Sequence, residues 1–124
     1  MKENVVVLGA SDKPERYAYQ AMKKLLAHGH HPILVNPRLD EIEEMKVYSS
    51  LPEVGQDYGK IDTLTLYLGP KLSSLHVDEI VGLAPGRVIL NPGTENPTLE
   101  QALKSAGIPY EYACTLILLS TGQF

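Results

Sequence analysis

The chain has 124 residues, of which 44% are hydrophobic and 21% charged, a composition that excludes intrinsic disorder and predicts one domain over residues 1–124. Its net charge of −4 gives no general attraction for nucleic acid, and no apolar run is long enough to span a membrane. The single cysteine excludes an internal disulfide and is typical of a reducing compartment, and an apolar run starts within a few residues of Met1, so we expect a cytoplasmic protein without a signal peptide.

The first predicted element is a buried strand, the apolar run Val5–Leu8, which stops at a glycine. The small residues Gly9–Ser11 then predict a turn ahead of an amphipathic helix, which we expect to run from residue 16 or 17 to His28. Asp12, with Glu15 three residues later, resembles the capping box of a helix start. A strand, a glycine turn and a helix start in this order are how α/β proteins hold phosphate groups.

The rest of the chain repeats this alternation. Four further strands are predicted from apolar runs: Pro32–Val35, Ile61–Leu68, Arg87–Leu90 and Ile108–Ala113. Apolar residues at helical spacing predict helices over Leu72–Leu83 and from Pro97 to a cap at Gly107. Residues 47–48 are expected to form a short extended piece, and the apolar tail Thr115–Leu119 is expected to pack against the body of the molecule.

Alternating strands and helices are typical of a parallel, doubly wound sheet that is covered by helices on both faces. We therefore predict an α/β fold of three layers, α/β/α, with a five-stranded parallel sheet and right-handed crossovers. The predicted strand order is 3-2-1-4-5. Ligands bind such sheets beyond the carboxyl ends of the strands, where the strand order reverses, here between the first and fourth strands.

Four of the predicted strands end in loops that are rich in Gly, Pro and Asn, and parallel strands bring these loops to one edge of the sheet. Each loop alone is an ordinary turn, but the agreement of all four favours a binding site. The loops are Gly9, Ala10 and Ser11; Asn36, Pro37 and Arg38; Leu68, Gly69 and Pro70; and Asn91, Pro92 and Gly93.

The first loop matches neither of the two common phosphate motifs. The dinucleotide fingerprint needs three glycines, of which only Gly9 is present, and no Gly-Lys-Ser/Thr completes a Walker loop. Where a nicotinamide site has an acidic residue after the second strand, this chain has Arg38. Its guanidinium suits a ribose phosphate, either the 2′-phosphate of NADP or the 3′-phosphate of coenzyme A. Arg16 and Lys13 follow the first loop and can meet a diphosphate, although for Lys13 a solvated surface position is equally expected.

Several motifs together resemble a known protein family. The run V-V-L-G-A-S-D-K-P-E-R-Y-A-Y-Q is followed by V-N-P-R, V-Y-S-S-L-P-E-V, L-N-P-G-T-E-N and Y-E-Y-A-C. Over nearly the whole chain this resembles the small stand-alone CoA-binding proteins, which are similar to the CoA-binding domain of the succinyl-CoA synthetase α subunit. The resemblance implies a Rossmann-like fold that binds coenzyme A in an extended crevice.

The resemblance also implies roles for the loops. The first loop would approach the diphosphate between Arg16 and Tyr19, and Pro37 with Arg38 would meet the adenosine and its 3′-phosphate. The loop after the third predicted strand would line the adenine or pantetheine side, and the loop after the fourth would form the far wall. The implied CoA-binding residues are Gly9, Ala10, Ser11, Arg16, Tyr19, Asn36, Pro37, Arg38, Leu68, Gly69, Pro70, Asn91, Pro92 and Gly93.

Histidine and cysteine give little sign of catalysis in this sequence. His28, His30 and His31 fall at the amino edge of the sheet, opposite the predicted ligand edge, without the cysteines or carboxylates of a metal site, so no metal is expected. His76 is expected on a plain helix surface. Cys114 follows the fifth strand, either as a small buried residue or close to the CoA thiol, where a mixed disulfide could form.

Two hypotheses follow from the sequence. The favoured one is a binding, carrier or sensor module for CoA or an acyl-CoA that has no catalytic residues of its own. The alternative is an NADP-dependent oxidoreductase with Arg38 on the 2′-phosphate, although the ligand edge offers no Tyr-Lys or His-Asp pair for it. The apolar tail, with Tyr110 and Tyr112, is consistent with three roles: covering an edge of the sheet, forming a homodimer, or binding an unknown partner protein. The sequence does not choose among them.

Overall fold

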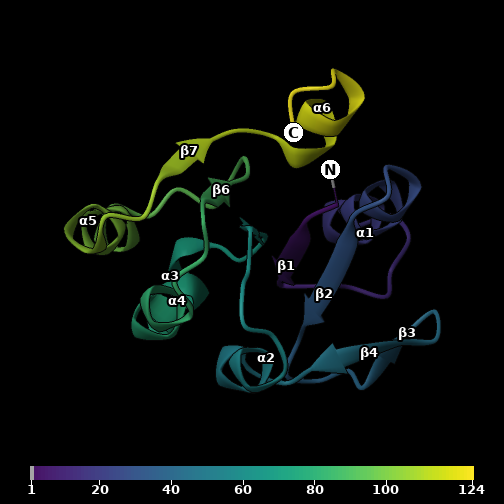
Figure 1. The fold of residues 1–124 in the computed structure, drawn as a ribbon, viewed down its shortest axis with the longest axis horizontal. Coiled ribbons are helices and arrows are strands. Elements are labelled where there is room, and N and C mark those ends of the chain that lie inside the picture. The colour runs from purple at the N-terminus through teal and green to yellow at the C-terminus, as the bar shows by residue number, and fades with distance from the viewer. Residues whose placement is uncertain (1) are drawn as a thin grey trace.

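The structure, a computed structural model, describes residues 2–124 and contains a seven-stranded sheet with helices on both faces (Figure 1). The strands are β1 (Asn4–Leu8), β2 (His31–Val35), β3 (Glu41–Ile42), β4 (Met45–Tyr48), β5 (Thr63–Leu66), β6 (Val88–Leu90) and β7 (Tyr110–Tyr112). They lie in the order β3-β4-β2-β1-β5-β6-β7, and all neighbouring pairs are parallel except β3 with β4.

Two layers of helices enclose the sheet. Helices α1 (Tyr17–Ala27) and α6 (Thr115–Ser120) pack together over one face, as Figure 1 shows. The other face carries α2 (Leu51–Asp57), α3 (Pro70–Ser73), the 3-10 turn η1 (Ser74–His76), α4 (Val77–Leu83) and α5 (Pro97–Ala106). The predicted three-layer α/β/α fold is therefore confirmed, with two short strands, β3 and β4, in addition to the five expected. Within residues 2–124, no helix is long and apolar enough to cross a membrane.

Strand β1 is buried on both faces, which explains why its apolar run does not alternate with polar residues. Val6 and Leu8 belong to the hydrophobic cluster beneath α2, α4 and α5, while Val5 and Val7 belong to the cluster beneath α1 and α6. Burial of one such side chain stabilises the fold by about 1.5–3 kcal/mol. The loop after β1 therefore stands on a strand in the interior of the sheet.

The apolar tail packs against the body as predicted, and it does so as a helix. Leu119 of α6 is 2% exposed and lies in the same hydrophobic cluster as Leu25 of α1. The first residue of α6, Thr115, is also buried. The fifth predicted strand therefore leads directly into a helix that completes the layer over β1 and β2.

The predicted strand order is wrong at one position. β5, the third strand of the prediction, pairs with β1 and does not lie outside β2, where β4 is found instead. Only Val47 and Tyr48 of β4 are buried, so the apolar pattern there is too short to indicate a full strand. The crossover through α2 then carries the chain back past β2 and β1, so the strand order reverses between β1 and β5.

The single helix predicted over residues 72–83 is broken into α3, η1 and α4. Ser73 is fully buried, and its hydroxyl accepts a hydrogen bond from Nδ2 of Asn96 at 2.8 Å. This contact turns the segment around, so that Leu72 and Leu75, whose spacing predicts inward positions, are 52% and 75% exposed. The prediction for these two leucines is therefore wrong.

Helix α1 begins without the predicted capping box. Its N-cap residue is Arg16, no side chain accepts a hydrogen bond from the first turn, and the first turn contains no acidic residue. Asp12 and Glu15 lie exposed in the preceding loop. The amino end of α1 is consequently left without a side-chain partner for its backbone N–H groups.

Candidate functional site

The loops that follow β1, β2, β5 and β6 lie at one edge of the sheet, as predicted, because these strands are parallel. They surround an open cavity of about 820 Å³, which is within the size range of cavities that bind small ligands. The predicted site residues that line this cavity are Gly9, Ala10, Ser11, Arg16, Asn36, Arg38, Gly69, Pro92 and Gly93.

A side chain at the position of Gly9 would be strained and crowded. Its φ is +96°, in the left-handed region, and a Cβ there would lie 3.1 Å from the backbone carbonyl of Tyr67. The N–H groups of Gly9 and Ala10 both donate to the carbonyl oxygen of Val35 at 3.1 Å. The first loop is therefore fixed between the ends of β2 and β5, and its residues line the cavity.

The side chain of Asn36 connects the first loop to the second. Its Nδ2 donates to the carbonyl oxygen of Ala10 at 2.7 Å, and its Oδ1 accepts from the backbone N–H of Arg38 at 2.8 Å. Asn36 lines the cavity, but both of its polar groups are already used in these contacts. It therefore holds Arg38 in a fixed relation to the first loop.

The open amino end of α1 faces the cavity, since Arg16, Tyr17 and Ala18 are among the lining residues. A helix amino end carries a partial positive charge and unpaired N–H groups, both of which favour an anion. With no side-chain cap and no acidic residue in its first turn, α1 offers these groups to a ligand.

Three cations, Lys13, Arg16 and Arg38, line the cavity and are exposed. None of them takes part in the ion pairs found among residues 2–124. Two carboxylates, Asp12 and Glu15, also line the cavity, which leaves a small excess of positive charge in a chain of net charge −4. The positive charge is local to the end of the cavity near β1 and β2.

A smaller hollow of about 90 Å³ adjoins the ends of β1 and β2 on the face that α2 and α4 cover. Its lining is largely apolar and includes Pro37 and Leu68, two predicted site residues that do not line the main cavity. His76 also lines this hollow, with Nδ1 3.0 Å from Oε1 of Glu79. The prediction of a plain surface position for His76 is therefore wrong, because the break at η1 brings this residue to the ligand edge.

The other three predicted site residues lie outside both linings. The hydroxyl of Tyr19 donates to Glu43 at the turn between β3 and β4. Pro70 is exposed at the start of α3. Asn91 is 2% exposed, so its side chain lies inside the protein and not at the far wall.

Asn91 instead joins three elements through hydrogen bonds. Its Nδ2 donates to Oγ1 of Thr65 at 2.7 Å and to the carbonyl oxygen of Leu66 at 2.8 Å, both in β5. Its Oδ1 accepts from the backbone N–H of Thr115 at 2.9 Å, at the start of α6. The side chain of Asn91 therefore holds β5 and the start of α6 together inside the protein and does not line the cavity.

Several cavity residues were not predicted from the sequence: Tyr17, Leu39, Tyr67, Leu72 and Thr94. Each lies within a few residues of one of the four loops. Extending each predicted loop by its flanking residues would therefore have included them. Burial raises the pKa of Tyr67 to about 12, although the nearby hydroxyls of Thr115 and Thr65 act in the other direction. Cys114 is half-buried near this phenol and is not among the residues that line the cavity.

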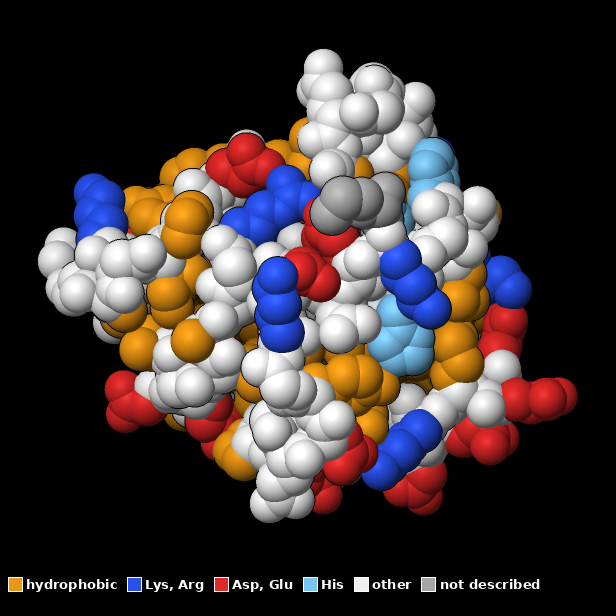
Figure 2. Space-filling view, viewed as in Figure 1, with side chains coloured by type: hydrophobic (Ala, Val, Ile, Leu, Met, Phe, Trp, Pro, Cys, Tyr) orange, Lys and Arg blue, Asp and Glu red, His pale blue; other side chains and the backbone are white. Residues whose placement is uncertain are grey.

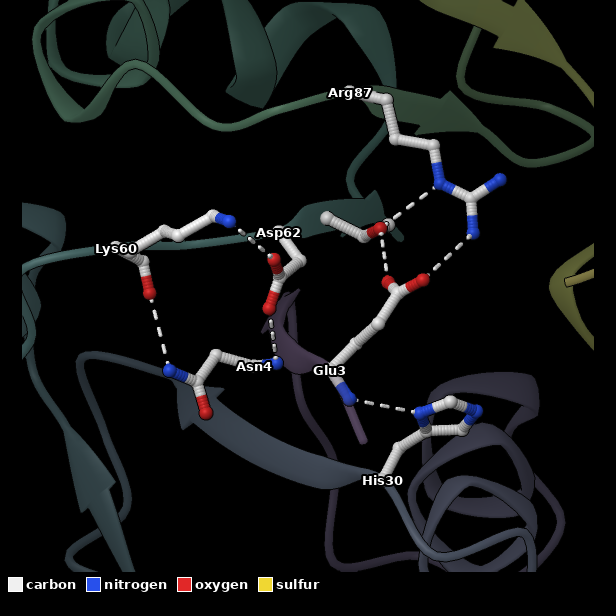
Figure 3. Close-up of polar contacts among 7 residues, drawn as sticks. Glu3, Asn4, His30, Lys60, Asp62 and Arg87 are labelled. Atoms are coloured by element: carbon white, nitrogen blue, oxygen red, sulfur yellow. Dashed lines mark hydrogen bonds and ion pairs between the residues drawn. The ribbon is translucent and has the colours of Figure 1, made fainter. Parts of the chain in front are cut away.

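The opposite, amino edge of the sheet is occupied by a network of polar contacts (Figure 3). The backbone N–H of Glu3 donates to Nδ1 of His30 at 3.1 Å, and Oε1 of Glu3 accepts from the hydroxyl of Thr63 at 2.7 Å. Arg87 donates through Nε to the same Thr63 hydroxyl at 2.9 Å. In the part of the chain that the structure describes, no group of three or more His, Cys, Asp or Glu residues is arranged to hold a metal ion.

The face of the molecule seen in Figure 2 carries Lys and Arg side chains interspersed with Asp and Glu. It has no broad patch of one sign on the surface in view.

The family model described as "CoA binding domain" matches residues 3–120. A partial sequence match is to the uncharacterized protein YneT of Bacillus subtilis, 34% identical over 65 residues. These residues make up 52% of this chain and 46% of that protein, so the match spans about half of each.

Solved structures match over nearly the whole chain. A protein from Thermus thermophilus described as cell-free ID.343 is 31% identical, with a TM-score of 0.88 over 98% of this chain and 90% of that one. A crystal structure of an uncharacterized protein is 37% identical, with a TM-score of 0.90 over 100% of this chain and 99% of that chain.

Proposed function

The chain belongs to the CoA binding domain family, and from this premise we propose that it binds coenzyme A or an acyl-CoA through the nucleotide and the diphosphate. One observation carries the proposal: an uncapped helix start and three cations that form no ion pair within residues 2–124 face the same cavity. Together the helix start and the three cations form a binding site for a ligand with several phosphate groups.

We assign the diphosphate to the first loop and the amino end of α1. Gly9, Ala10 and Ser11 line the cavity, and because the N–H groups of Gly9 and Ala10 already donate to Val35, the free backbone donors are those at the start of α1. Arg16 stands at the N-cap of α1 and can provide a planar fork for phosphate oxygens. Lys13, in the loop just before Arg16, adds a second positive charge.

We assign the adenosine to the second loop. The small apolar hollow between Pro37 and Leu68 is suited to one edge of a flat ring, with His76 at its rim. Arg38 lines the main cavity next to this hollow and is held by Asn36, so its guanidinium can reach a phosphate on the ribose. In coenzyme A this phosphate is on the 3′ oxygen.

We further propose that the protein is a binding, carrier or sensor module without chemistry of its own. Among the residues that line the main cavity, none is a histidine or a cysteine. Burial raises the pKa of Tyr67, so at neutral pH its phenol stays protonated and is a poor base. The lining therefore supplies binding groups and lacks an evident nucleophile with a partner base.

Calorimetric titration of the full chain with CoA and with NADP tests the proposal. We expect CoA to bind and NADP to bind at least about ten times more weakly, since the family description names CoA. In thermal unfolding, CoA at a hundred times its dissociation constant should stabilise the protein by about 2.7 kcal/mol. Binding of NADP without binding of CoA would favour the oxidoreductase alternative instead.

A further inference from the structure

The charges around the main cavity are divided between its two ends. The neighbouring strands along this edge are β2, β1, β5 and β6, and the cations all follow β2 or β1. The part of the lining that follows β5 and β6 contains no charged residue: Tyr67, Gly69, Leu72, Pro92, Gly93 and Thr94. The cavity is therefore polar and cationic at one end and neutral at the other.

The neutral end has few polar side-chain groups left for a ligand. The hydroxyl of Thr94 donates to the carbonyl oxygen of Asn91 at 2.7 Å, and Thr94 is 4% exposed. The phenol oxygen of Tyr67 is buried from solvent and has no hydrogen-bond partner among residues 2–124. A carboxylate placed at this end would lose hydration without gaining a charged partner from the lining, which is costly.

The charged groups nearest to this end in sequence do not change the conclusion. Lys71 and Glu95 are exposed and lie outside the lining. The carboxylate of Glu95 accepts a hydrogen bond from the backbone N–H of Gly93 at 3.3 Å, so a negative charge already stands beside the neutral wall. Lys71 and Glu95 carry opposite charges, so together they leave this end of the cavity neutral.

Leu72 gives the neutral end an apolar surface. It lines the cavity and is 52% exposed, because its neighbour Ser73 is anchored inward by Asn96. On the other side of the cavity Tyr17, which is 69% exposed, also lines the space. Large apolar side chains that are exposed at a cavity suggest a ligand that covers them.

We propose that this protein prefers acyl-CoA thioesters with a short, uncharged, apolar acyl group over free CoA and over thioesters with a terminal carboxylate. This inference rests on the proposed function, because it needs the phosphates at the cationic end to direct the rest of the ligand toward β5 and β6. Leu72 is then the residue that determines specificity, through contact with the acyl chain.

Calorimetric titration with CoA, acetyl-CoA, butyryl-CoA and succinyl-CoA tests the preference. We expect butyryl-CoA to bind about 5-fold more tightly than acetyl-CoA, since each of its two extra methylene groups would be partly buried. Succinyl-CoA should bind about 10-fold more weakly than butyryl-CoA. Equal affinities across the series, or tightest binding of succinyl-CoA, would overturn the inference.

Two variants in the same segment separate the role of Leu72 from a general effect. Leu72→Asn should remove the advantage of butyryl-CoA and leave the affinity for free CoA within about 2-fold. Leu75→Asn changes the same residue type at a site that is 75% exposed and outside the lining, so it should change neither value. If the wild type does not bind CoA at all, the proposed function itself is contradicted. If both variants lose the butyryl-CoA advantage equally, the role of Leu72 is contradicted.

Discussion

Three asparagine side chains hold the carboxyl edge of the sheet together. Asn36 joins the first loop to the second, and Asn91 joins β5 to the start of α6. Asn96 caps α5 through Oδ1 and holds Ser73 through Nδ2. Asparagine in a loop is an ordinary turn signal, so the sequence predicts where these residues lie. It does not show that Asn91 and Asn96 are buried, because that depends on hydrogen-bond partners more than twenty residues away.

Replacement of Arg38 tests the nucleotide end of the site. In Arg38→Ala we expect the affinity for CoA to fall about 10-fold, because a charge-assisted contact to the 3′-phosphate is lost. Dephospho-CoA lacks that phosphate, so its affinity should stay nearly unchanged. Titration calorimetry with both ligands measures the two losses separately.

The matched control for this variant is Lys104→Ala, which removes a cation from the exposed surface of α5. It tests whether net charge alone affects the binding of a polyanion, and we expect no change for either ligand. Equal losses for CoA and dephospho-CoA in Arg38→Ala would mean that Arg38 does not meet the 3′-phosphate.

At the scale of elements, the sequence predicts β1, α1 and α5 well because their signals are local. The apolar run of β1 and the stripe of α5 are visible in a few residues, and Gly107 ends α5 with φ +73° as its position indicates. The break between α3 and α4 is different, since it depends on the contact of Ser73 with Asn96. The exposure of Leu72 and the position of His76 follow from this break and were missed for the same reason.

The end of α4 offers a test of helix capping. Ala84 follows the last residue of α4 with φ 52° and ψ 55°, a left-handed conformation that costs a non-glycine residue about 1–2 kcal/mol. Glycine avoids this cost but loses about 0.5–1 kcal/mol more in backbone entropy on folding. We therefore expect Ala84→Gly to raise the free energy of unfolding by about 0.5–1 kcal/mol, measured by urea denaturation.

Gly107 at the end of α5 provides the reciprocal control. It has φ +73°, and a Cβ added there would have no atom within 4 Å, so Gly107→Ala changes backbone preference without a clash. We expect a loss of stability of similar size. A fall in stability for Ala84→Gly, or a gain for Gly107→Ala, would show that the left-handed conformation is not what limits these helix ends.

At the scale of the whole molecule, the order of the strands determines which loops meet in the cavity. Because β5 lies next to β1, the loop that begins at Gly9 stands between Arg38 on one side and Leu72 on the other. The sequence predicts that the four loops share an edge, since this needs only parallel strands. It could not predict their order, because β4 has too short an apolar pattern to be counted as a strand.

At the amino edge, His30 contacts both Glu3 near the beginning of the described chain and the ring of Phe124 at its end, with 5.0 Å between ring centroids. The stability of this edge should depend on pH. The Nδ1 of His30 accepts a hydrogen bond from Glu3, which requires that this nitrogen carry no proton. Burial lowers the pKa of His30 below its ordinary value of 6.5, opposed by the nearby Glu3 carboxylate and assisted by His28 and Arg87. A lowered pKa in the folded state means that the unfolded chain binds the proton more readily, so this contribution is present above pH 6.5 and is lost as the pH falls through the folded-state pKa.

The variant His30→Asn keeps an acceptor at this position and removes the titration. Between pH 7.5 and 5.5 we expect the free energy of unfolding of the wild type to fall more steeply than that of His30→Asn, as measured by urea denaturation at each pH. One proton can contribute at most about 1.4 kcal/mol per pH unit, and His30 is partly exposed, so the difference in slope should be well below that limit. Parallel curves for wild type and His30→Asn would mean that the contact between Glu3 and His30 does not stabilise the amino edge.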